Sequence, residues 1–359
     1  MPGLPVGDAD LQQGSGVASG EAWMNLLKFA GSLVLAFVLA AATPAAAPVD
    51  GLTRYVAGDI DAATPGPVSG GLLLMGGGDR DPAAMRWFFA KAGRGHIVIL
   101  RASYGGEAGE EFYREIGGIA SAETFVFSGR AASSDPHMLA RLARADGIFI
   151  AGGDQANYVR YWKGTPVAAA LDAHVAAGKP IAGTSAGLAM LGERLYGAMD
   201  GGSLTSAEAL ADPFGPANTI ERDFLHIALL RGIVTDTHFK ERDRLGRLMA
   251  FLAKAQRGAR AGDRAMLGLG VDEDAAVAVE PDGTARLFSI KPDGGAWLVD
   301  GAGLRGIRAK GPLTAARVEV TGIGRASVLH LPSGRVEAPT FRRAYRLGGG
   351  RIVELPAEK

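Results

Sequence analysis

The sequence contains no cysteine among its 359 residues. This absence excludes disulfide bonds, thiolate metal ligands, a cysteine-linked lipid anchor and a cysteine nucleophile. Any covalent catalysis must therefore use an oxygen or a nitrogen atom.

The sequence also lacks an excess of charge of either sign, because 38 Lys and Arg residues balance 38 Asp and Glu residues. Balanced charge gives no electrostatic reason to expect a nucleic acid or a membrane surface as a partner. Hydrophobic residues make up 47% of the chain, enough for a sizeable core in one large domain or two ordinary ones. We predict a globular protein, and the sequence leaves its oligomeric state open, a homodimer included.

Residues 24–47 have the pattern of a secretory signal. Lys28 precedes an apolar run of about 14 residues, shorter than the roughly 20 that a membrane span needs. A run of small residues ends at Ala47, so we expect a signal peptidase to cleave there and no membrane anchor to be retained. The mature protein would then be secreted or periplasmic, without a stable membrane span. Residues 1–23 precede the signal pattern, which suggests that translation starts at Met24.

Short apolar runs then alternate with helix-forming segments. We expect strands at 70–75, 97–100, 124–127, 147–151 and 180–184, and helices at 83–91, 109–116, 134–145 and 166–177. This alternation predicts right-handed crossovers and a mainly parallel sheet with helices on both faces. Residues 50–69, rich in Gly, Pro and Asp, are interpreted as a leader into the first domain.

A G-x-S-x-G motif centred on Ser185 lies between an apolar run and a helix-forming stretch. In such a strand–turn–helix arrangement the serine Oγ stands clear of the sheet edge, beside amides of the new helix. A Cβ at Gly183 or Gly187 would crowd the turn or the contact between the helix and its neighbouring strand. The motif favours Ser185 as a nucleophile; the alternative is an ordinary turn.

Two glycine-rich loops also follow expected strands. The loop at 76–78 has neither the spacing of a dinucleotide fingerprint nor the Lys-Ser/Thr of a P-loop, so phosphate binding is not expected there. The loop Gly152-Gly153 follows the strand at 147–151. Because sites form where parallel strands end, this loop and Ser185 are expected to share one crevice.

An apolar run at 232–236 ends in Thr237 and His238. A histidine just past a strand end is placed to act as a general base. The following helix, expected at 241–249, carries arginines that could clamp a carboxylate or simply form a solvated face. The polar segment 198–219 upstream is a candidate lid.

From residue 267 onward the pattern is β-rich. We expect strands at 267–280, 284–290, 296–300, 317–321, 327–331 and 351–355. Asp272, Glu273 and Asp274 would point to alternate faces of a strand, which favours a turn or helix-cap role over a cation site. We therefore predict no metal ion, and no motif calls for a cofactor.

Taken in order, these motifs resemble the cyanophycinase and dipeptidase E group of serine peptidases. The resemblance rests on residues 152–155, 183–187 and 236–248, and it extends over roughly residues 68–302. It implies an α/β fold: a three-layer α/β/α sandwich with a mainly parallel sheet, akin to class I glutamine amidotransferases. The implied organisation is an N-terminal extension and signal peptide at 1–47, a catalytic domain at 48–302 and a small C-terminal β-rich extension at 303–359.

By position, the resemblance makes Ser185 the nucleophile and His238 its general base. The amides of Ala186 and Gly153 would form an oxyanion hole. A third acid should orient the histidine. Among acids of the 198–219 segment, Glu208 is the first choice and Asp200 the second.

The resemblance also implies a substrate and the residues that hold it. The substrate would be a peptide or a β-aspartyl polymer, cleaved by a serine-type exopeptidase at β-aspartyl-type or acidic bonds. Cyanophycinases carry glutamine where Thr237 stands. Two alternatives stay open, an α/β-hydrolase-type esterase and a catalytically silent surface-binding protein. The residues expected to bind substrate are Gln155, Asp236, Arg242, Arg244 and Arg247.

Overall fold

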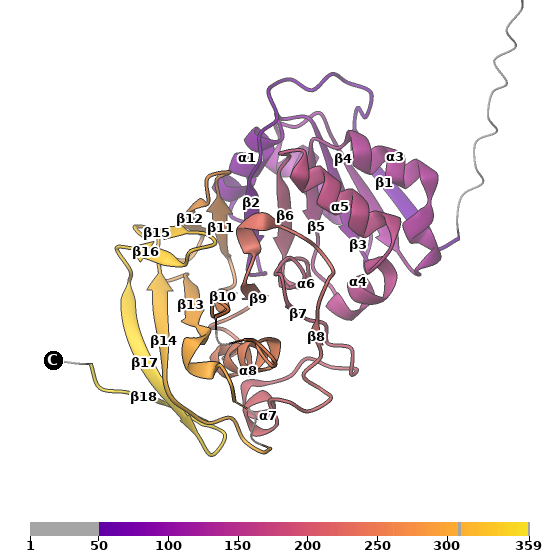
Figure 1. Cartoon of the computed structure of the whole chain (residues 1–359). Helices are drawn as coiled ribbons and strands as arrows, with labels where there is room; N and C mark the ends of the chain where they lie inside the picture. Colours follow the sequence, from indigo (N-terminus) through magenta and orange to yellow (C-terminus); the bar gives the residue numbers. More distant parts are fainter. Residues whose placement is uncertain (1–49, 261, 308–309, 358–359) are drawn as a thin grey trace, which may run out of the picture. The chain divides into compact units, whose positions relative to one another are not determined.

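The structure, a computed structural model, describes residues 50–260, 262–307 and 310–357 (Figure 1). The predicted signal peptide at 24–47 lies outside the described residues. The described residues cluster as one compact unit. Within the described ranges, no helix combines the length and the apolar character that crossing a membrane requires.

The larger sheet of the described chain has ten strands in the order β1-β4-β3-β5-β6-β2-β11-β12-β15-β16. Its middle strands, β4, β3, β5, β6 and β2, pair in parallel, and its remaining pairs are antiparallel. The sheet is therefore mixed, and the expected parallel pairing is limited to its middle. The strands are β1 (Leu52–Gly58), β2 (Leu72–Met75), β3 (His96–Arg101), β4 (Ser121–Phe127), β5 (Gly147–Ile150), β6 (Ile181–Thr184), β11 (Ala275–Val279), β12 (Thr284–Ser289), β15 (Val328–His330) and β16 (Arg335–Glu337).

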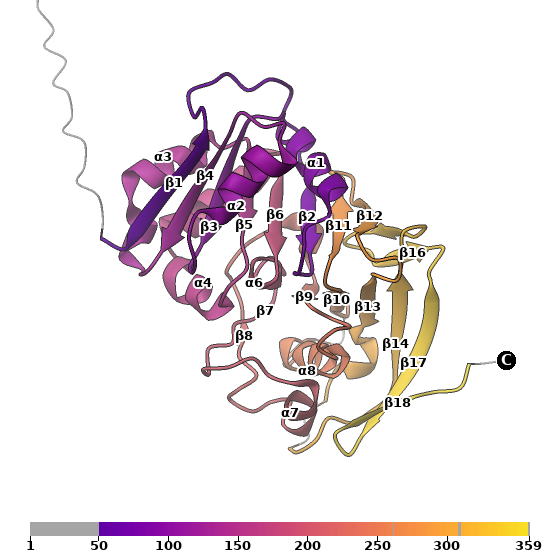
Figure 2. The same ribbon diagram turned by 180° about the vertical axis from the view of Figure 1, so that it is seen from behind.

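Helices cover both faces of this sheet. Figure 1 shows α3 and α5 in front of the strands, and Figure 2, from behind, shows α1 and α2 in front of them. Successive strand residues point to opposite faces, so Leu74 of β2 joins the core under α3 and α5 while Leu73 joins the core under α1. The helical segments are α1 (Pro82–Lys91), α2 (Glu107–Glu110) continuing as a π-helix (Glu111–Ile116), a 3-10 turn (Ala131–Ser134), α3 (Pro136–Arg144), α4 (Gln155–Trp162), α5 (Pro166–Ala176) and α6 (Ala186–Ala189).

A second sheet of the described chain has six strands in the order β18-β17-β14-β13-β10-β9. Only β9 and β10 pair in parallel; the other pairs are antiparallel. The buried side of α8 packs against this sheet in one hydrophobic cluster. The elements are β9 (Ile233–Asp236), β10 (Leu267–Val271), β13 (Ala296–Asp300), β14 (Ala315–Ile323), β17 (Phe341–Gly348), β18 (Arg351–Glu354), α7 (Ser206–Ala211), α8 (Leu245–Ala255), 3-10 turns Ala228–Leu230 and Gly301–Leu304, and a separate two-stranded ribbon, β7 (Leu195–Tyr196) with β8 (Ile220–Glu221).

Residues after 302 continue both sheets. Strand β14 pairs with β13, and β15 pairs with β12. The strands expected at 317–321, 327–331 and 351–355 are confirmed, and β16 and β17 add to them. A domain boundary at 302 stays a prediction.

Three local expectations are wrong. The leader at 50–69 contains β1, an edge strand paired with β4, and its exposed side chains hid it from an apolar pattern. Residues 267–280 form two strands in different sheets, because Asp274 takes a positive φ of 59° between them. The helix expected at 241–249 begins only at Leu245, since Asp243 has a φ of 46°.

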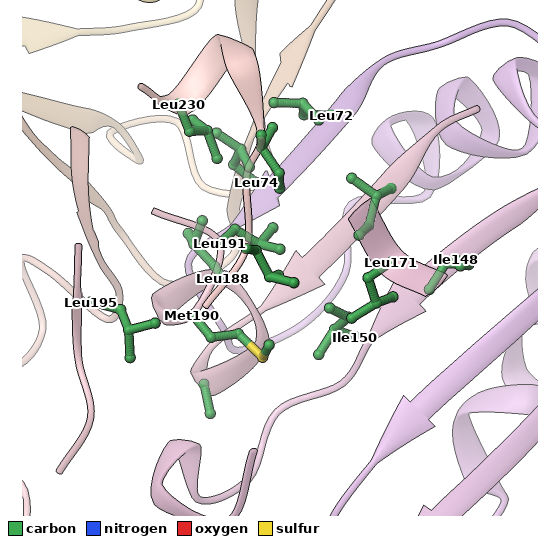
Figure 3. Close-up of a cluster of buried hydrophobic side chains, with 14 of the residues drawn as sticks. Leu72, Leu74, Ile148, Ile150, Leu171, Leu188, Met190, Leu191, Leu195 and Leu230 are labelled. Atoms are coloured by element: carbon green, nitrogen blue, oxygen red, sulfur yellow. The ribbon is translucent and has the colours of Figure 1, made fainter. Parts of the chain in front are cut away.

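The core beneath α6 fixes the turn that precedes it. Figure 3 shows Leu188 of α6 and Leu191, just after that helix, in one buried cluster with Leu74 of β2 and Ile150 of β5. All four side chains are buried completely or nearly so. Because these side chains are closely packed, α6 can take only one position relative to the sheet.

Candidate active site

Ser185 occupies a sharp turn between β6 and α6. Its φ of 51° and ψ of −121° lie where a residue with a side chain is strained. The flanking glycines make the turn fit: a Cβ on Gly183 would lie 2.6 Å from the Gly187 carbonyl oxygen, and one on Gly187 would lie 2.1 Å from that of Ile150. The steric role predicted for both glycines is confirmed.

The loops after three adjacent strands, β5, β6 and β2, meet at Ser185. A Cβ on Gly152, in the loop after β5, would lie 3.3 Å from the Ser185 Cβ. The Ser185 amide donates to the carbonyl of Met75, the last residue of β2, at 3.1 Å. The expected crevice shared by Ser185 and the Gly152 loop is confirmed.

His238 reaches Ser185 from the second sheet, just after β9. Its Nε2 lies 2.7 Å from Ser185 Oγ. The ring rests on Gly77, where an added Cβ would lie 2.2 Å from the imidazole Cε1. The glycine-rich loop after β2 thus makes room for the imidazole ring, a role that the sequence did not suggest.

The carboxylate behind His238 is Glu273, whose Oε1 lies 2.5 Å from the imidazole Nδ1. The expectation of Glu208 is wrong in this geometry: its Oε2 accepts from the Thr205 amide at 2.8 Å, in a capping box that starts α7. Asp200, the second choice, forms no hydrogen bond or ion pair with His238 in the described structure. Glu273 lies beside His238 because β9 and β10 pair in parallel, which places the residues that follow the two strands next to each other.

The two acids beside Glu273 have other tasks. Asp272 accepts from the Lys240 amide at 3.1 Å and from Trp297 Nε1 at 3.0 Å, and burial raises its pKa to about 6. Asp274 accepts from the Asp79 amide at 2.6 Å. The segment is a turn between β10 and β11, as predicted, and of its three acids Glu273 is the one with a hydrogen bond to the histidine among the described residues.

The electrostatics favour a neutral imidazole. Burial lowers the pKa of His238 below its ordinary 6.5, and the nearby cations Arg242 and Arg244 lower it further against the opposing effect of Glu273. A neutral Nε2 can accept a proton from Ser185 Oγ near pH 7.

A pocket of about 320 Å³ opens beside Ser185. Among residues expected to bind substrate, Gln155, Arg242 and Arg244 line it. Gly153 and Ala186 also line it, and their amides donate to no other group in the described chain. The 198–219 segment supplies one wall through Ala198, Gly201, Gly202 and Ser203.

Asp236 and Arg247 lie behind the pocket, and their expected direct contact with substrate is not supported by the geometry. Both side chains are about 2% exposed and form a buried ion pair, with Arg247 Nε 2.8 Å from Asp236 Oδ2. Arg247 also donates to Ser203 Oγ at 2.8 Å and to the Leu204 carbonyl at 3.1 Å. The pair connects the His238 segment to the pocket wall.

Sequence reasoning missed two residues of this site. Glu273 was visible within a run of three acids, but its direction depends on the break between β10 and β11. Arg160 lines the pocket from α4, five residues after Gln155, and had no distinguishing pattern of its own.

Comparisons with known proteins agree with the motifs. The model of peptidase family S51 matches residues 130–285, which include Ser185, His238 and Glu273. A cyanophycinase from Synechococcus elongatus is 33% identical over 179 residues, 50% of this chain and 49% of that protein. A cyanophycinase from Trichormus variabilis is 27% identical over 247 residues, 66% of this chain and 76% of that protein.

The match to the first of these relatives spans about half of its length, 49%. The crystal structure of a peptidase from an acI-B1 Actinobacterium superposes with a TM-score of 0.45 and 17% identity, covering 70% of this chain and 97% of the other.

The family match and the curated relatives confirm the resemblance that the motifs predict, and the chain is similar to the cyanophycinases and to peptidase family S51.

Proposed function

We propose that this chain is a serine-type peptidase that cleaves β-aspartyl-type or acidic peptide bonds through an acyl-enzyme. One observation carries the proposal: Ser185 Oγ, His238 and Glu273 form a continuous chain of contacts at 2.7 Å and 2.5 Å beside an arginine-lined pocket. Similarity to peptidase family S51 supports it.

In the first step, Ser185 Oγ attacks the carbonyl carbon of the scissile bond while His238 Nε2 takes the hydroxyl proton. Glu273 accepts from Nδ1, which holds the correct tautomer and stabilises the imidazolium that forms. His238 then gives its proton to the leaving amine, and an ester to Ser185 remains. Water activated by His238 hydrolyses that ester and frees the serine.

The negative oxygen of each tetrahedral intermediate needs donors fixed in advance. The amides of Ala186 and Gly153 line the pocket, and neither has an acceptor among the residues that the structure describes. Tyr158 fixes the loop that carries one of them, since its hydroxyl donates to the Ala151 carbonyl at 2.6 Å. These two amides are the proposed oxyanion hole.

The pocket suits an anionic group near the scissile bond. Arg244 is 7% exposed, and burial lowers its pKa to about 10, so the side chain stays charged at neutral pH. Arg242 is half exposed and Gln155 adds an amide. Guanidinium groups bind carboxylates strongly, which favours acidic substrates.

The signal pattern at 24–47 supports the further proposal that the peptidase is exported. N-terminal sequencing of protein recovered from periplasm or medium tests this, and a new N-terminus near Pro48 is the expected result. Protein that keeps residues 24–47 would contradict cleavage.

The test of activity is release of product from cyanophycin and β-aspartyl dipeptides by the purified mature chain. Ser185→Ala should lower turnover by about 10⁵-fold or more, because the variant lacks the Oγ that forms the acyl-enzyme. A fluorophosphonate should label wild type and not the variant. Turnover of simple esters but no peptide would favour an esterase, and neither labelling nor turnover would favour a silent binding protein.

A further inference from the structure

Three guanidinium groups line the pocket beside Ser185, and they come from two elements. Arg160 lies on α4, while Arg242 and Arg244 follow His238. The described pocket lining contains one carboxylate, Asp154, so its charges do not balance.

That carboxylate is already engaged. Asp154 is the N-cap of α4, and its Oδ1 accepts from the Ala156 amide at 2.9 Å. A capping carboxylate of this kind satisfies a helix amide and stabilises the helix start. Both arginines after His238 also have a carboxylate partner, Asp236 for Arg244 and Glu273 for Arg242, so the positive charge left for a ligand is mainly that of Arg160.

The three arginines differ in how far the protein already uses them. Arg244 donates to the Thr237 carbonyl at 2.8 Å, and Arg242 lies 3.7 Å from Glu273. The exposed guanidinium of Arg160 has no hydrogen bond or ion pair with any other part of the described chain. Arg160 is thus the pocket cation most available to a substrate.

We propose that the site selects peptides with a second carboxylate next to the scissile bond over peptides with arginine there, and that Arg160 determines this specificity. The inference rests on the proposed peptidase function. A second substrate carboxylate would form a charge-assisted hydrogen bond to Arg160. An arginine side chain at the same place would meet a like charge in a confined pocket.

The experiment compares two soluble substrates, β-aspartyl-aspartate and β-aspartyl-arginine, by their kcat/KM values. Wild type should prefer the acidic dipeptide by about 10-fold to 100-fold, the range that one charged hydrogen bond supplies. Arg160→Gln should remove most of that preference. Arg160→Glu should reverse it, because the new carboxylate pairs with the substrate guanidinium.

Arg86→Gln is the matched control. Arg86 is an exposed arginine of α1, on the other face of the larger sheet, so the variant loses the same charge away from the pocket. It should keep the wild-type preference. An equal change in Arg86→Gln and Arg160→Gln would show a general charge effect and overturn the role of Arg160.

Labelling of Ser185 by a fluorophosphonate, run on each protein, separates a wrong specificity from a missing serine nucleophile. A wild type that labels but prefers β-aspartyl-arginine, or whose preference survives Arg160→Gln, overturns this inference and leaves the proposed function in place. A wild type that neither labels nor turns over either dipeptide overturns both.

Discussion

The carboxylate at His238 Nδ1 sets the tautomer and orientation of the ring, so Glu273 should matter more than any other acid of the site. Glu273→Gln keeps the shape of the side chain but replaces the carboxylate with an amide, which can present an N–H donor to His238 Nδ1. We expect kcat to fall by about 10³-fold to 10⁴-fold, as for a triad acid elsewhere. Steady-state kinetics on a β-aspartyl dipeptide measure this.

The comparison variant is Glu208→Gln. Glu208 caps α7, where a glutamine side chain can still accept from the Thr205 amide, so the variant should keep near wild-type kcat. If Glu208→Gln proved as damaging to kcat as Glu273→Gln, the assignment of the third acid would be wrong.

The pH profile reports on the same histidine. Burial holds the pKa of His238 below its usual 6.5, and Arg242 and Arg244 contribute. A base is active when unprotonated, so a lowered pKa preserves activity to lower pH, and the acid limb of kcat/KM should have its midpoint below 6.5.

Replacing Arg242 by Gln removes one cation near the imidazole, which raises the pKa of His238 and should move the acid limb to higher pH. The measurement is kcat/KM across roughly pH 4.5 to 8 for both proteins. An acid limb that moves to lower pH in the variant would contradict the electrostatic argument.

At the scale of elements, the pocket wall at 198–204 depends on Tyr196 of β7. Its hydroxyl donates to the Gly202 carbonyl at 2.9 Å and accepts from the Leu204 amide at 3.1 Å. Tyr196→Phe removes both bonds, each worth about 1 kcal/mol. We expect KM to rise about threefold to tenfold with a smaller change in kcat, because the wall lines the proposed substrate pocket and, within the described residues, forms no hydrogen bond with Ser185.

Tyr161→Phe is the control, since the half-buried Tyr161 loses a hydroxyl that bonds to no other group of the described chain. Its KM should stay near the wild-type value. A kcat loss without a KM change in Tyr196→Phe would mean that the wall acts on the catalytic residues instead.

At the scale of the whole molecule, residues after 302 complete the core around α8. Leu313, Val318 and Leu347 are buried with Phe251 of α8 in one cluster. Each large apolar side chain buried contributes about 1.5–3 kcal/mol, so their loss approaches the whole stability of an ordinary domain. A chain ending at residue 302 should fail to unfold cooperatively in a thermal melt followed by circular dichroism.

The matched deletion removes only residues 356–359, which follow the last strand, β18. This shortened chain should melt like the full protein. A cooperative transition of the chain ending at 302, at the full-length temperature, would show that the C-terminal strands are dispensable.

Local sequence patterns were enough to predict part of the fold and part of the candidate site. The central strands were predictable because buried parallel strands appear as short apolar runs, as at β3 and β5. Ser185 was predictable because its turn needs glycines at fixed neighbouring positions. His238 was predictable because it follows an apolar run directly.

Tertiary structure decided the rest. The edge strand β1 is mostly exposed, so its place in the sheet comes from pairing with β4 and not from an apolar pattern. Arg247 resembles a substrate ligand in sequence, yet it faces Asp236 because both are buried by the same packing.

The sequence by itself thus predicted the proposed nucleophile, the proposed base and the family resemblance, each from short motifs of residues that are neighbours in the chain. Only the fold determined that Glu273, and not Glu208, meets His238. The physical reason is register: β9 and β10 pair in parallel, and this places two chain segments more than thirty residues apart within one hydrogen bond.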